Sequence, residues 1–164
     1  MSAITNYSDV IPLEQVKLYL RFDETECDVD HEIGFMRDSA CQLVEAYSNY
    51  RIKPQAIDYY FQEGYVNVYD FPIVTVDNAV GTYKRTNKGL YSQFEDCSTL
   101  ENDNTPLTIN LGYTDTTQNV PPILIQAVLE TVRVWFFSAE SDSMKGALPE
   151  LAMSMLNPIK RFIF

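Results

Sequence analysis

The amino-acid sequence predicts an α+β fold: a small bundle of about four helices, with an antiparallel β-module inserted between the second and third helices. Apolar residues recur with a period near 3.6 before residue 53 and after residue 120, and with a period near 2 between them. The 164 residues, 46% hydrophobic and 21% charged, are enough to bury one core. We expect a single domain over 1–164, with helices in 12–53 and 121–157, strands in 57–113 and a C-terminal tail in 158–164.

Two helices are expected in the first third of the chain. Pro12–Arg21 begins with proline, which suits a first helical turn, and carries one apolar stripe. The acidic run Asp23–Asp30 leads into a second helix from about Val29 to Tyr47, whose acidic first turn faces the positive end of the macrodipole. The apolar face of this second helix contains Ile33, Met36, Ala40, Leu43, Val44 and Tyr47.

Short strands follow Lys53-Pro54. Alternating apolar and polar residues, with β-branched and aromatic side chains, favour strands over turns and helices. A hairpin turn is expected at Thr86–Gly89, with glycine where a positive φ is needed, and a polar loop is expected over 95–106. The expected strands are Ile57–Phe61, Tyr65–Tyr69, Ile73–Val76, Val80–Arg85, Leu90–Phe94 and Leu107–Leu111.

The third helix is expected from Val120 to about Ser138, and a short fourth helix from Leu148 to Asn157, stopped by Pro158. Of the 15 residues from Ile123 to Phe137, 11 are apolar. A helix that is apolar nearly all round lies centrally in its own domain or is shared with a neighbouring subunit. We therefore assign four residues of this helix to the core or to a subunit seam: Val128, Val132, Trp135 and Phe136.

The composition argues against several classes of function. Twelve basic and 23 acidic residues give a formal net charge of −11, which repels nucleic acid and anionic membranes. The N-terminus lacks the basic residues and the apolar run of a secretory signal. The most apolar stretch is interrupted by charged residues, so it is not expected to span a membrane. The three cysteines, Cys27, Cys41 and Cys97, match no zinc or redox spacing. We expect reduced, intracellular synthesis and no membrane contact.

Catalytic chemistry is not expected either. His31 is the single histidine, and although Cys27 lies four residues before it, no second pair of soft ligands completes a metal site. The acidic run of residues 23–32 offers carboxylate pairs, but the helix dipole explains it more simply. Gly81–Gly89 only superficially resembles a phosphate loop, since its lysine is misplaced. No cofactor or metal is therefore expected.

Two basic spots stand out against the acidic background. The first is at the expected hairpin tip and contains Lys84, Arg85 and Lys88. Solubility alone is a sufficient explanation for basic residues at this exposed position. The second is the tail, where Lys160 and Arg161 precede three apolar residues, Phe162–Phe164. This tail either folds back onto the helices or docks on a partner, with arginine and aromatic rings as anchors.

Five segments, in this order along the chain, resemble those of a known family. Ile11–Arg21 and Val44–Arg51 resemble the first helix and the end of the second helix of one family. Gly112-Tyr113, then the helix from Val120 with Trp135, and finally Leu148–Arg161 resemble its later segments. That family is the head-tail connectors of tailed phages, the head-completion adaptors beneath the portal. The resemblance extends from about residue 11 to residue 161, and it rests on the order of the segments along the chain.

This resemblance implies a structural virion protein of the neck, made in the host cytoplasm, with no enzymatic activity. About twelve copies would form a ring around the DNA channel through heterologous contacts, as genome packaging and ejection require. Its partners would be the portal protein, a stopper or tail-completion protein, and passing double-stranded DNA bound without sequence specificity. The resemblance assigns the portal contact to Pro158, Ile159, Lys160, Arg161, Phe162 and Phe164, and a contact with DNA or the next ring to Lys84, Arg85 and Lys88.

Other functions stay open at this point. The chain can be another phage neck or tail-completion protein with a different neighbour. It can also be a monomeric, non-viral binding module that uses its sheet and its tyrosine-rich surface, since the chain has 11 tyrosines. An enzyme with a carboxylate pair in residues 23–32 is the weakest alternative. A protein that forms the ring is expected to associate with itself at high concentration, whereas the binding module is expected to stay monomeric.

Overall fold

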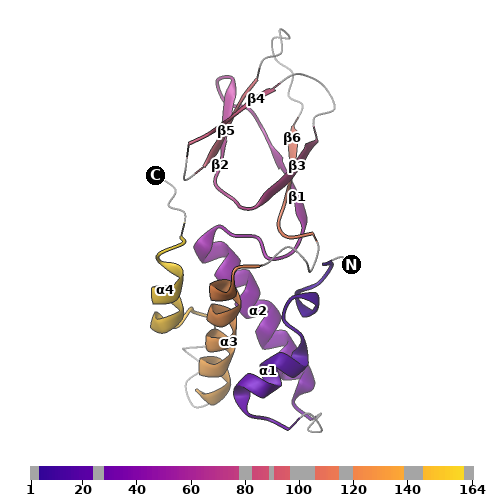
Figure 1. The fold of residues 1–164 in the computed structure, drawn as a ribbon, viewed down its shortest axis with the longest axis vertical. Coiled ribbons are helices and arrows are strands. Elements are labelled where there is room, and N and C mark those ends of the chain that lie inside the picture. The colour runs from indigo at the N-terminus through magenta and orange to yellow at the C-terminus, as the bar shows by residue number, and fades with distance from the viewer. Residues whose placement is uncertain are drawn as a thin grey trace.

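The computed structural model describes residues 4–23, 28–77, 83–88, 91–96, 106–114, 120–138 and 146–160. Figure 1 shows the helices gathered at one end of an elongated molecule and the strands at the other. The described residues form η1 (Tyr7–Asp9), α1 (Leu13–Leu20), α2 (Asp30–Ser48), β1 (Gln55–Tyr59), β2 (Tyr65–Val68), β3 (Ile73–Asp77), β4 (Tyr83–Asn87), β5 (Ser92–Asp96), β6 (Leu107–Leu111), α3 (Pro122–Phe137) and α4 (Glu150–Leu156). The predicted α+β fold, with its β-module between the second and third helices, is confirmed.

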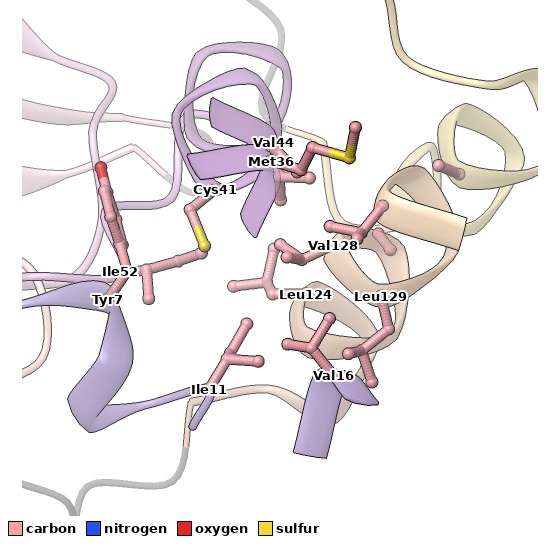
Figure 2. Packing of buried hydrophobic residues seen from close by; sticks show 14 of the residues in the cluster. Tyr7, Ile11, Val16, Met36, Cys41, Val44, Ile52, Leu124, Val128 and Leu129 are labelled. Carbon is pink, nitrogen blue, oxygen red and sulfur yellow. The ribbon is translucent and has the colours of Figure 1, made fainter. Parts of the chain in front are cut away.

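The helix α3 is the centre of the helical end and packs against α1, α2 and α4. Its sequence is apolar on nearly every side, and each of these three neighbours covers part of it. In Figure 2, Leu124 and Val128 of α3 face Val44 of α2, while Val16 of α1 lies beside Leu129. Because α3 is surrounded within its own chain, most of its apolar surface is already buried.

The strands form two three-stranded antiparallel sheets, with the orders β1-β6-β3 and β2-β5-β4. In the first sheet, β6 is the central strand, and alternate residues Leu107, Ile109 and Leu111 are fully buried. From the second sheet, Val68 and Phe94 join the same apolar cluster. The β-module therefore has a core of its own, separate from that of the helices.

The β4–β5 hairpin differs from the prediction in register. Asn87 pairs with Ser92 and the backbone N–H of Lys88 donates to the Tyr91 carbonyl, so β4 extends into the turn expected at Thr86–Gly89, and β5 begins at Ser92 rather than at the expected Leu90. The expected loop also begins later, because β5 continues to Asp96. This register pairs Phe94 with Arg85 on one side and with Val66 on the other, at a fully buried position. Burial of one large aromatic side chain outweighs the local preference for a turn. Gly89 itself lies outside the described residues.

None of the described helices is both long and apolar enough to cross a lipid bilayer.

Candidate interaction surfaces

A buried carboxylate fixes the β-module to the helical bundle. Glu45, near the end of α2, accepts hydrogen bonds from the backbone N–H of Ile52 at 2.6 Å and of Lys53 at 3.4 Å. The Tyr7 hydroxyl donates to its other oxygen at 3.1 Å. Burial raises the pKa of Glu45 above its ordinary value, although these three donors oppose the shift. One side chain thus holds the N-terminal segment, α2 and the chain leading into β1 together.

A second set of contacts continues the same junction toward the sheets. Arg51 forms an ion pair with Asp70 at 2.7 Å, and the Tyr59 hydroxyl donates to the same carboxylate at 2.8 Å. The backbone N–H of Arg51 donates to the Phe71 carbonyl, and the N–H of Phe71 donates to the Asn49 carbonyl. The end of α2 is therefore bonded directly to the segment between β2 and β3.

The start of the C-terminal tail folds back onto α2. The Tyr47 hydroxyl donates to the side-chain oxygen of Asn157 at 2.8 Å, and the Lys160 ammonium lies 3.7 Å from the centre of the Tyr47 ring. Ile159 is half-buried against the helical core, and Pro158 is exposed. The other residues predicted to touch the portal, Arg161, Phe162 and Phe164, lie outside the described residues.

The four residues assigned to core or seam lie between the middle of α3 and its C-terminal end. Val128 and Val132 are fully buried, and Trp135 is 4% exposed, with its indole N–H donating to the Ala147 carbonyl at 3.0 Å. Phe136 is half-buried, and its ring packs edge-to-face on Phe22 with centroids 5.1 Å apart. All four make their contacts within the helical core of one chain.

The basic hairpin residues are exposed on β4 and just after it. Lys84 lies opposite Glu95 in the antiparallel pair, an arrangement that offsets part of its charge. The Arg85 guanidinium lies 5.8 Å from the centre of the Phe94 ring and donates to the Ser92 hydroxyl at 3.3 Å. Lys88 is exposed. The three cations are thus spread along the strand rather than gathered in one cluster.

The described residues line hollows that were not predicted as sites. One, of about 370 Å³, lies beside α2 and is lined by Glu32, Phe35, Met36, Ser39, Trp135 and Gly146. Another, of about 470 Å³, lies in the β-module and is lined by Asp58, Tyr59, Tyr60, Gln62, Tyr65, Val66, Asn67 and Tyr69. The many tyrosines of the sequence predicted a tyrosine-rich binding surface, but they did not indicate that it would lie in the β-module. Among the described residues, no cluster of three or more His, Cys, Asp or Glu side chains is arranged to hold a metal ion.

Comparisons with known proteins give a match in fold. No protein-family model matches the sequence, and no curated protein is detectably similar to it. A chain in the neck of the empty gene transfer agent (GTA) particle, computed with C6 symmetry, superposes with a TM-score of 0.68 and 13% identity, covering 99% of this chain and 96% of that one. A chain in the native GTA virion gives 0.69 and 12%, over 98% and 94%. A chain in the neck of the native particle, computed with C12 symmetry, gives 0.67 and 12%, over 100% and 97%.

This chain therefore shares its fold with chains found in the necks of gene transfer agent particles. The likeness extends over nearly the whole of both chains, including the helical bundle and the inserted β-module. The resemblance to head-tail connectors, first seen in the order of five sequence segments, is confirmed at the level of the fold.

Proposed function

We propose that this protein is a structural neck protein of a phage-like particle. It acts as an adaptor: about twelve copies form a ring beneath the portal, join head to tail and line part of the DNA channel without catalysing a reaction. The observation that supports this most strongly is the near full-length match in fold to chains of GTA necks solved with C12 and C6 symmetry.

The charge of the chain suits a channel for DNA. A net charge of −11 on each copy leaves few cations to neutralise phosphates, so DNA slides past without being held. The exposed hairpin cations Lys84, Arg85 and Lys88 are the local exception, and they contact DNA or the next ring.

The tail makes the contact with the portal. Asn157 and Lys160 both contact Tyr47, so the start of the tail is held on the bundle just before its last residues. Those residues, Arg161, Phe162 and Phe164, are of the types that dominate binding energy at protein interfaces. A short anchored segment with such side chains loses less conformational entropy on docking than a free peptide does.

Substitution of the tail tests this contact. We expect the triple variant Arg161→Ala, Phe162→Ala and Phe164→Ala to bind the portal protein of its own particle at least about a hundredfold more weakly, because it removes all three proposed anchors. Lys160 is kept because it packs on Tyr47. The matched control changes to alanine three exposed residues that no proposed contact uses, Glu14, Gln15 and Leu18, and it is expected to bind like the wild type. Binding to immobilised portal measures both, and equal binding by the tail variant and the wild type contradicts the assignment.

A second candidate function is a monomeric binding module. The tyrosine-lined hollow of the β-module favours it, because Tyr60 and Tyr65 are 54% and 40% exposed, and Tyr59 and Tyr69 line the same space. Tyrosine suits such a surface, with an apolar ring for contact and a hydroxyl for hydrogen bonds. This module stays monomeric at high concentration, whereas the ring protein associates with itself.

A further inference from the structure

The last turns of α3 carry two different surfaces that face opposite ways. Arg133 and Phe137 are four residues apart and therefore lie on one side of the helix. Trp135 is two residues from each, about 200° around the helix axis, and lies on the other side. A contact that repeats head to tail between copies needs such a pair of distinct, outward-facing surfaces.

The first surface, here called the groove, lies on the Trp135 side. Its hollow of about 370 Å³ is lined mainly by apolar side chains, with Met36 and Trp135 nearly buried and Phe35 71% exposed. The indole of Trp135 is held by its hydrogen bond to the Ala147 carbonyl, so this wall of the groove is fixed. Glu32 lines the groove and is exposed, which adds a negative charge to it. A large exposed aromatic ring beside an apolar hollow marks an interaction site.

The second surface, here called the knob, is centred on Phe137, which is 63% exposed. Its ring packs edge-to-face on Phe136 at 5.5 Å, and Phe136 packs in the same way on Phe22. This stack fixes a protruding ring at little entropic cost to binding. Arg21 and Arg133 lie beside Phe137 around a shallow hollow of about 330 Å³, and both are exposed.

The position of Arg133 is set by the chain itself. Its guanidinium forms an ion pair with Glu130, whose carboxylate also accepts a hydrogen bond from the Tyr19 hydroxyl at 3.0 Å. Gln126 donates to the same hydroxyl at 2.9 Å. The ion pair lowers the pKa of Glu130, so both partners stay charged at neutral pH. The cation beside Phe137 is thus held in place before any partner arrives.

We propose that the groove of one copy receives the Phe137 knob of a second copy, and that this head-to-tail contact is the seam of the ring. The aromatic ring enters the apolar hollow beside Phe35, while Arg21 and Arg133 approach Glu32. Apolar surface meets apolar surface and opposite charges meet in this pairing, whereas each surface paired with itself would bring like charges together. The inference rests on the proposed ring and names the residues that build it.

Sedimentation of four proteins tests the seam: the wild type and the variants Phe137→Asp, Phe35→Asp and Leu151→Asp. Each substituted side chain is at least half exposed, so the fold is expected to persist, and circular dichroism checks it. At about 1 mM, where even a contact worth ~4 kcal/mol is half formed, the wild type and Leu151→Asp associate. Phe137→Asp and Phe35→Asp stay monomeric, with association weakened by about a hundredfold or more.

Mixing the two monomeric variants gives the sharpest result. Phe137→Asp keeps an intact groove and Phe35→Asp keeps an intact knob, so an equimolar mixture forms a dimer and nothing larger. Charge reversal gives an independent check: Glu32→Arg and Arg21→Glu each weaken association, and the double variant restores it.

Three results overturn the seam. In the first, the wild type stays monomeric at about 1 mM. In the second, Phe35→Asp associates like the wild type. In the third, Phe35→Asp has a lowered melting temperature, while Phe137→Asp associates normally. The last result identifies the occupant of the groove as a segment of the same chain. The second and third results leave the proposed ring intact. A wild type that stays monomeric also counts against the ring, and the position of the protein in the particle then separates failure of the seam from failure of the proposed function.

Discussion

Replacement of Glu45 by alanine is expected to lower the free energy of unfolding by about 3–5 kcal/mol. The substitution removes the acceptor of the Ile52 and Lys53 backbone N–H groups and of the Tyr7 hydroxyl. Ile52 is fully buried and Tyr7 is 5% exposed, so water does not replace the lost partner without opening the core. Urea denaturation followed by circular dichroism measures the loss.

The matched control is Glu45→Gln, which keeps an acceptor oxygen of the same reach without the charge. It is expected to retain most of the stability, and a loss as large as that of Glu45→Ala contradicts this explanation. The pair also has a pH signature. Because burial raises the pKa of Glu45 in the folded protein, stability relative to Glu45→Gln is highest below the ordinary glutamate pKa of 4.5 and declines as the pH rises through the raised value.

Replacement of Gly112 by alanine is expected to cost at least about 3 kcal/mol. Gly112 follows β6 with φ +97°, a conformation that side chains disfavour. A Cβ there would lie 2.7 Å from the carbonyl carbon of Lys53 and closer still to its oxygen, so the clash is with backbone. The Gly112 N–H also donates to the Pro72 carbonyl at 2.9 Å, which leaves this residue little room to shift.

The control for this substitution is Gly34→Ala in the interior of α2. An added Cβ at Gly34 meets no atom within 4 Å, so alanine is expected to stabilise the helix by about 0.5–1 kcal/mol. Thermal unfolding of the two variants measures the contrast. A Gly112→Ala variant that melts with the wild type contradicts the close approach between β6 and the chain that enters β1.

The helices were predictable because their signals are local. Proline residues mark helix boundaries at Pro12, Pro121, Pro149 and Pro158, and apolar residues recur at a helical period in the segments that form the helices. The register of the β4–β5 hairpin was not predictable in the same way. It depends on which residue reaches the core of the sheets, and Phe94 takes that place although the Asn-Lys-Gly sequence favours an earlier turn.

The buried charged residues were missed because their partners are distant in sequence. Tyr7 lies 38 residues from Glu45, and Tyr19 lies 111 residues from Glu130. No local sequence pattern predicts such pairs, and a single glutamate in a helix is usually exposed to solvent. The one available signal was the segment Val44–Arg51, whose resemblance to the connector family includes Glu45.

The groove and the knob were missed for a different reason. Phe35 lies off the apolar stripe of α2, between Ile33 and Met36, and an aromatic residue outside the stripe was a usable signal of a surface site. Phe137 is the last apolar residue of a helix that is apolar almost throughout. Only the packing of α1, α2 and α4 around α3 shows which of its residues are left exposed.

Labelling in the particle tests the central claim most directly. A tag on residue 1 of this protein, decorated with gold in purified particles from its source and viewed by electron microscopy, reports where the protein lies. The N-terminus is used because the tail is assigned to the portal. A neck adaptor gives one cluster of label per particle, at the junction of head and tail. Label scattered over the capsid, or absent from particles, contradicts the account and favours the monomeric binding module.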